Sequence, residues 1–100
     1  MAHPVNVDRR LAPRLTGAQA GVERIRFRGG RSARVVDLSA SGALIEADWR
    51  LLPGSRVELL VGDPTPHRAT GRIVRAHVSF LSRERIRYRG AVAFDDRIPL

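Results

Sequence analysis

The chain has 100 residues and 43% hydrophobic content, enough for one domain, and no apolar run is long enough to cross a bilayer. It has no cysteine, which excludes disulfides, thiolate metal sites and cysteine nucleophiles. It has no lysine either: 18 arginines against 10 acidic residues give a formal net charge of +8. That surplus favours an anionic partner, whether a nucleotide, a nucleic acid or an acidic protein.

Residues 1–21 contain Pro4, Pro13, Gly17 and Gly21 and have no sustained apolar period. We therefore expect a flexible, irregular arm over residues 1–21, without a helix, followed by a folded domain over residues 22–100. The first ten residues lack the apolar segment of a secretory signal, so we expect a cytoplasmic location and no membrane partner.

A β-strand pattern begins at residue 23. There Ile25 and Phe27 alternate with arginines, and Gly29-Gly30 suits a two-residue hairpin turn because glycine tolerates a positive φ. The predicted strands are Glu23–Arg28, Ser32–Leu38, Ala43–Ala47, Arg56–Val61, His67–Val78 with a bulge or bend at Gly71, and, after a turn at Ser82–Arg85, the run from Ile86 to Phe94.

Six short strands separated by turn residues predict an all-β fold, a six-stranded antiparallel β-barrel behind an irregular N-terminal arm. No helical period of useful length occurs, and residues 95–100 leave room for at most a minimal closing helix. We expect Trp49 to cap the barrel as a partly buried aromatic residue.

Arg10 and Arg14 are spaced R-x-x-x-R within the expected arm, directly after Arg9. The spacing alone is weak, because other arginine pairs in the strands repeat it. The context distinguishes this pair, since Pro13 restrains the backbone beside it and arginines on an arm can fold over a ligand. Arginines on strand faces are more often solvated.

A second pattern, D-x-S-x-x-G, occupies Asp37, Ser39 and Gly42 at the exit of a predicted strand. Taken alone, it predicts an ordinary β-turn. Together, in this order, the two patterns resemble the PilZ domain family, which has R-x-x-x-R in an N-terminal arm and [D/N]-x-S-x-x-G some twenty to thirty residues later. The resemblance runs from about residue 8 to residue 94. The short carboxyl end departs from it, because many members add a helix there.

The resemblance implies a receptor for the bacterial second messenger cyclic di-GMP. Guanidinium groups pair with phosphates, fork onto guanine and stack on purines, while a carboxylate accepts hydrogen bonds from guanine N–H groups. Ser39 would offer a hydroxyl, and Gly42 would let the backbone pass close to the ligand. The implied ligand-binding residues are Arg9, Arg10, Arg14, Asp37, Ser39 and Gly42.

Ligand binding would order the arm and change the surface offered to a protein effector. PilZ-like domains bind one cyclic di-GMP or an intercalated pair, and the third guanidinium supplied by Arg9 leads us to favour the pair.

Two other functions stay open. One is a basic β-barrel that binds single-stranded nucleic acid, which would need exposed aromatic platforms. The other is a PilZ-like protein adaptor without nucleotide, a type that usually lacks the arginine motif. We expect no metal or other cofactor, because His3, His67 and His77 lack ligand spacing. We expect no enzymatic activity, because neither G-x-S-x-G nor a phosphate-binding lysine motif occurs.

Overall fold

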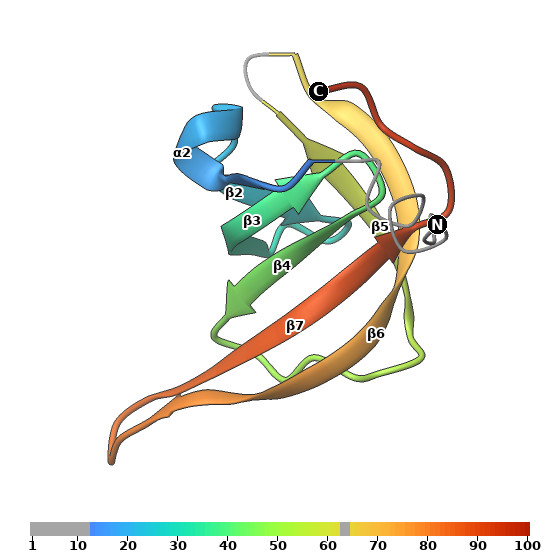
Figure 1. Cartoon of the computed structure of the whole chain (residues 1–100). Coiled ribbons are helices and arrows are strands. Elements are labelled where there is room, and N and C mark those ends of the chain that lie inside the picture. The colour runs from blue at the N-terminus through green and yellow to red at the C-terminus, as the bar shows by residue number, and fades with distance from the viewer. Residues whose placement is uncertain (1–12, 63–64) are drawn as a thin grey trace, which may run out of the picture.

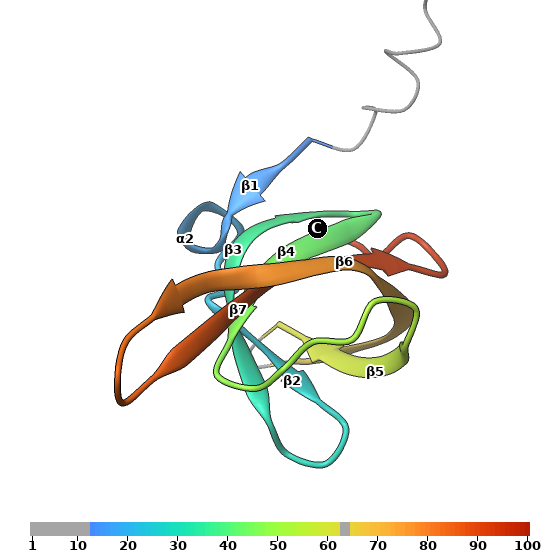
Figure 2. The ribbon, with the colours of Figure 1, turned by 90° about the horizontal axis from the view of Figure 1, so that it is seen from below.

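Six strands close into an antiparallel barrel in the computed structural model, which describes residues 13–62 and 65–100 (Figure 1, Figure 2). Around the ring each strand pairs with the next in the order β3-β2-β5-β6-β7-β4, and β4 pairs back with β3 to close it. The strands are β2 (Arg24–Phe27), β3 (Ser32–Ser39), β4 (Gly42–Ala47), β5 (Arg56–Val61), β6 (His67–Leu81) and β7 (Ile86–Phe94). The predicted all-β, six-stranded barrel is confirmed.

Alternation along the strands places one set of side chains inside the barrel. Ile25, Leu38, Ile45 and Leu59 are the largest apolar side chains that are fully buried. In β2 the predicted faces are confirmed, because Ile25 is buried and Phe27 packs against the core while the neighbouring arginines are exposed. Burial of such residues is the main stabilising term for a domain of this size.

A β-bulge interrupts the alternation of β3 at Val36. Val35 pairs with Ile45 of β4, but the next pair is Asp37 with Leu44, so Val36 has no partner across the strands. A bulge adds one residue on one strand and shifts the faces of those that follow. As a result Val35 and Leu38 are both buried, and Asp37 is left at the surface.

Residues 15–20 differ from the irregular structure expected for this part of the arm. Strand β1 (Leu15–Thr16) pairs with β3, and α2 (Gly17–Ala20) forms one helical turn. The Gln19 N–H donates to Thr16 Oγ1 (3.1 Å) and the Thr16 N–H donates to Gln19 Oε1 (2.9 Å), which is a reciprocal capping box. The prediction of no helix before residue 22 is therefore wrong for this turn.

The structure also differs in detail at the predicted Gly29-Gly30 turn and at Gly71, where a bulge or bend was predicted. The β2–β3 hairpin has a three-residue loop, because the Phe27 N–H donates to the Arg31 carbonyl (2.7 Å) and leaves residues 28–30 between them. Gly71 lies in continuous register and is no bulge; a Cβ there would collide with the Ala93 carbonyl oxygen. The irregularities of β6 fall further along, between Ile73 and Arg75 and between Val78 and Phe80.

The segment after β7 closes one end of the barrel without a helix. Ile98 is buried, and its N–H donates to the Ala40 carbonyl (2.9 Å) in the β3–β4 turn. Trp49 is partly buried and packs edge-to-face on Phe27 (5.3 Å between ring centroids), as expected for a capping aromatic. In the described part of the chain, no helix has the length and apolarity needed to cross a membrane.

Candidate functional site

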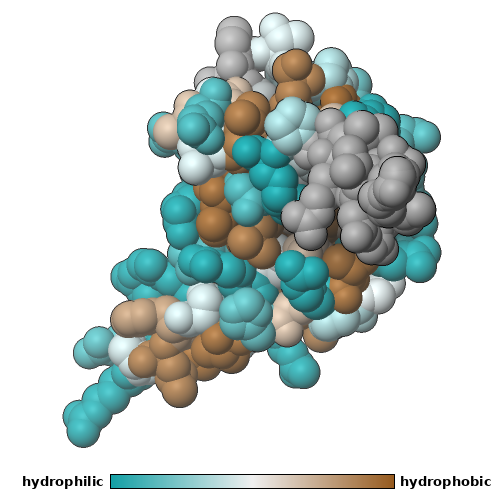
Figure 3. Space-filling view, in the orientation of Figure 1, coloured by the Kyte–Doolittle hydropathy of each residue, from teal (hydrophilic) through white to brown (hydrophobic). Residues whose placement is uncertain are grey.

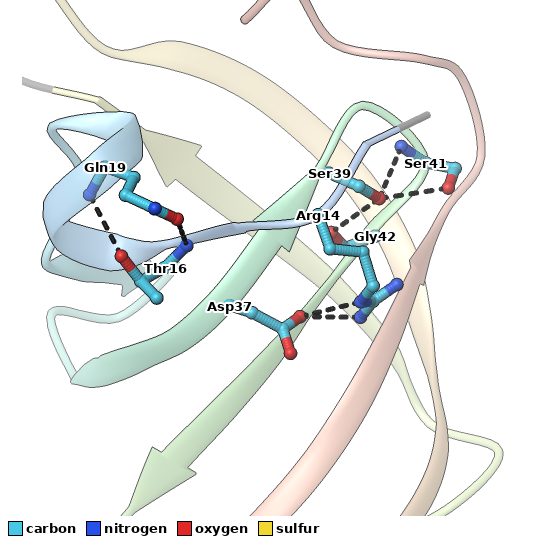
Figure 4. A network of polar contacts seen from close by, with 7 residues as sticks. All are labelled: Arg14, Thr16, Gln19, Asp37, Ser39, Ser41 and Gly42. Carbon is cyan, nitrogen blue, oxygen red and sulfur yellow. Dashed lines mark hydrogen bonds and ion pairs between the residues drawn. The ribbon is translucent and has the colours of Figure 1, made fainter. Parts of the chain in front are cut away.

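Strand β1 places Arg14, one of the predicted site arginines, next to the carboxylate of Asp37. Leu15 pairs with Leu38 and Thr16 pairs with Asp37, so the residue before β1, Arg14, lies beside β3. Its guanidinium donates to Asp37 Oδ1 from Nε (3.0 Å) and from Nη2 (2.6 Å), as Figure 4 shows. Two motifs that lie 23 residues apart in sequence therefore meet through one ion pair.

The Arg14–Asp37 pair is accessible to solvent. The Arg14 side chain is 55% exposed and the Asp37 side chain 26%. Within residues 13–62 and 65–100, neither Asp37 Oδ2 nor Arg14 Nη1 makes a hydrogen bond. The pair thus presents one carboxylate oxygen, which can accept from N–H donors, and one guanidinium nitrogen, which can donate to phosphate or to a base edge.

Ser39 has a different environment from the one expected of a ligand-binding hydroxyl. It is fully buried, and its Oγ accepts from the Ser41 N–H (3.3 Å), lies 3.1 Å from Ser41 Oγ and contacts the Gly42 carbonyl (3.4 Å). These contacts shape the β3–β4 turn (Figure 4). A ligand would reach this hydroxyl only after the turn rearranged.

Gly42 is required by a close approach of two strands. A Cβ at this position would collide with the Val92 carbonyl oxygen of β7, and the φ of Gly42 is not in the left-handed region. The turn before it is held from the same side, because the Phe94 N–H donates to the Ser41 carbonyl (2.9 Å). The structure thus explains Gly42 by packing of the barrel.

Of the six predicted site residues, Arg14 and Asp37 are brought together, and Ser39 and Gly42 pair with each other across the turn at residues 40–41 that joins β3 to β4. Arg9 and Arg10 lie outside the described residues. The capping box that holds β1 was missed, although the spacing of Thr16 and Gln19 is a known signal for a helix start.

A second polar network, around Glu46 of β4, was also missed. The Glu46 side chain is only 11% exposed and accepts from Arg34 Nη2 (2.9 Å), Ser79 Oγ (3.0 Å) and Arg89 Nη2 (3.3 Å). The hydrogen bond from Arg34 is the largest cause that lowers the pKa of Glu46, with burial opposing it. No local motif marks Glu46, because its partners come from three other strands.

A comparison of the sequence with models of known protein families agrees with the barrel fold. The model of the PilZ domain matches residues 8–98, nearly the whole chain. The chain belongs to the PilZ domain family. PilZ domains are known as cyclic di-GMP-binding and adaptor modules and not as enzymes. No curated protein and no solved structure gives a significant match to this PilZ domain.

The aromatic residues bear on the nucleic-acid alternative. All five lie in the described part, and Phe27, Trp49, Tyr88 and Phe94 pack against the core of the PilZ domain. Phe80 alone is well exposed, and the Arg87 guanidinium lies 5.5 Å from its ring centroid. One exposed ring does not form the row of stacking platforms that a binder of single strands uses.

Proposed function

We propose that this PilZ domain is a cyclic di-GMP receptor in which Arg14 and Asp37 form the fixed part of the ligand site and Arg9 and Arg10 supply the rest. The observation that carries the proposal is the Arg14–Asp37 ion pair, since it joins the arm motif to the turn motif. Membership of a family known to bind this nucleotide supports the choice of ligand.

The chemistry of the pair suits the two kinds of group in cyclic di-GMP. Asp37 Oδ2 would accept from the guanine N1 and N2 donors, which a phosphate lacks. Arg14 would keep its bond to Asp37 and use Nη1 for a phosphate oxygen or a guanine acceptor. An arginine that is already held by a carboxylate loses less conformational entropy when it binds, so the pair is preorganised.

The arm gives a route from binding to output. Arg14 stands at the start of the described residues and is anchored to the barrel through β1, so arginines earlier in the chain would be drawn toward the same surface by the phosphates. Contact of residues 1–12 with the ligand would change the surface that a protein effector meets.

The direct test is a calorimetric titration of the full chain with cyclic di-GMP, with linear pGpG and GTP as controls. We expect heat and saturation with cyclic di-GMP and much weaker binding of the controls, because only the cyclic dimer presents two phosphates and two guanines in one fixed ring. Absence of heat on protein with a β-type circular dichroism spectrum would overturn the proposal.

The number of ligands follows from the arginines of the arm. A mutually intercalated pair carries four phosphate charges, and a third guanidinium at Arg9 would offset part of their repulsion and offer a further face for a guanine. We therefore expect two ligands per chain in the wild type and one in Arg9→Ala. Saturation of the wild type at one ligand would remove the case for the pair; saturation of both proteins at two would assign the second ligand to other residues.

A further inference from the structure

Strands β6 and β7 extend beyond the rest of the barrel as a two-stranded finger, defined here as residues 78–87 (Figure 1, Figure 2). Pairing of β5 with β6 ends at Arg56 and Arg72, and pairing of β4 with β7 ends at Ala47 and Tyr88. Pairing between β6 and β7 continues to Leu81 and Ile86. The finger therefore has no neighbouring strand within the described residues.

One face of the finger is apolar and uncovered. Val78 pairs with Tyr88, whose side chain packs against the core, and Leu81 pairs with Ile86 one step further out on the same face. This face continues the interior face of the barrel past the point where the barrel ends. Val78, Leu81 and Ile86 are 51%, 70% and 41% exposed. Figure 3 shows hydrophobic side chains at the surface of the finger. An apolar surface of this kind marks an interaction site.

The outer edge of β6 is unpaired as well. Ile73, just beyond the β5 register, still bonds through its C=O and N–H to Gly54 and Ser55, but further along β6 the groups on the side away from β7 face no strand of the described chain. Natural proteins usually protect such an edge, because it is a template for pairing with another extended segment. A segment that paired there would place alternate side chains beside Leu81, on the apolar face of the finger.

The charge of the finger narrows the class of partner. Its residues include Arg83, Arg85 and Arg87 against a single acidic residue, Glu84. A second copy of a chain with net charge +8 would bring like charges together. Insertion into a lipid bilayer would bury the charged turn at residues 83–85, which forms the extremity of the finger, where Figure 3 shows hydrophilic side chains. An acidic polypeptide would neither repel the arginines nor require the charged turn to be buried in lipid.

We propose that the finger is a docking surface for an extended acidic segment of a partner protein, which pairs with the outer edge of β6, places apolar side chains beside Leu81 on the face that Leu81 shares with Ile86, and places carboxylates near the arginines. The surface is distinct from the Arg14–Asp37 pair. Asp37 pairs with Leu44 of β4, which in turn pairs with Ala91 of β7. Ala91 is five residues from Ile86 along β7, which is about 17 Å at 3.3 Å per residue. Partner binding through the finger does not depend on the cyclic di-GMP proposal.

A display library of random short peptides, panned on the full chain without nucleotide, is the test. We expect enriched peptides that alternate Leu, Ile, Val or Phe with Asp or Glu. A synthetic enriched peptide should bind the double variant Leu81→Ser/Ile86→Ser at least tenfold more weakly than the wild type by fluorescence anisotropy. The control is Leu52→Ser/Leu100→Ser, which removes two comparably exposed leucines elsewhere and should bind like the wild type.

Further measurements separate the alternatives. Both double variants should unfold at the wild-type temperature, because the replaced side chains are exposed, so a loss of peptide binding cannot be ascribed to unfolding. Enriched peptides without acidic residues, or equal binding by wild type and finger variant, would overturn the proposal. So would binding of the finger to phosphatidylglycerol vesicles, or self-association in sedimentation that the Leu81→Ser/Ile86→Ser variant abolishes, in place of peptide binding.

Discussion

Replacement of Arg14 by alanine separates a ligand-binding role of the Arg14–Asp37 pair from a structural one. With the Arg14 side chain 55% exposed, the ion pair is screened by solvent and contributes about 1 kcal/mol or less to folding. For a domain of this size, 1 kcal/mol corresponds to a shift in Tm of about 4–8 °C, so the variant should stay folded at room temperature. A charge-assisted contact to a ligand is worth about 1.5–3 kcal/mol, a loss of about tenfold to hundredfold in affinity.

The assay is calorimetry with cyclic di-GMP, together with thermal unfolding of each variant. Arg24→Ala is the matched control, because Arg24 is also an exposed arginine with local hydrogen bonds, to Ser32 Oγ (3.0 Å) and the Ser32 carbonyl (3.2 Å), and its loss changes the net charge equally. Arg14→Lys, which keeps the charge but loses the planar fork, should lie between wild type and alanine. If Arg14→Ala and Arg24→Ala lost the same affinity for cyclic di-GMP, the loss would reflect only the change in net charge, and the assignment of the site to Arg14 would be refuted.

Asp37→Ala should reduce discrimination between cyclic di-GMP and cyclic di-AMP more than it reduces binding of the phosphates; an unchanged preference would make Asp37 a turn residue only. Gly42→Ala should lower the Tm by more than about 10 °C, because the added Cβ meets the Val92 carbonyl oxygen and overpacking of this kind costs about 3 kcal/mol; an unchanged Tm would contradict it. The folded-state pKa of Glu46 is lowered, so its stabilisation is complete above its unfolded pKa and is lost as the pH falls through the folded value. Glu46→Gln should therefore flatten the fall in stability below about pH 4, and denaturant midpoints that fall as steeply as in the wild type would exclude this role.

The barrel could be predicted because each of its strands carries its own local signal. Alternation at Ile25 and Phe27 and again along β7, with turn residues between strands, was sufficient for strand number and approximate bounds, although β6 runs on to Leu81 where the prediction ended at Val78. The helical turn at Gly17–Ala20 was missed because four residues hold too little periodicity to detect; its stability comes from the Thr16–Gln19 capping box and from pairing of β1 with β3.

The placement of the candidate-site residues could be predicted only in part, because it depends on how β3 and β4 pair. The sequence places Asp37 after a strand, but the bulge at Val36 decides that Asp37 lies at the surface beside Arg14 while Leu38 lies in the core. A bulge depends on the pairing of two strands and leaves no dependable mark in one of them. The same holds for Ser39, since its burial follows from the fold around the turn and not from its place in D-x-S-x-x-G.

The finger shows that alternation of apolar and polar residues along a strand does not decide whether the apolar face is buried. Ile86 and Tyr88 follow the same alternating pattern as residues inside the barrel, but Val78 and Leu81 are three residues apart and share that face only because of the register shift between Val78 and Phe80. Whether that face is covered depends on other strands, namely on β4 ending at Ala47 and β5 beginning at Arg56. The exposed apolar surface thus results from a mismatch in strand length. Because Leu81 and Ile86 are 70% and 41% exposed and contribute little to the core of the barrel, their presence beside three arginines is better explained by a partner than by folding.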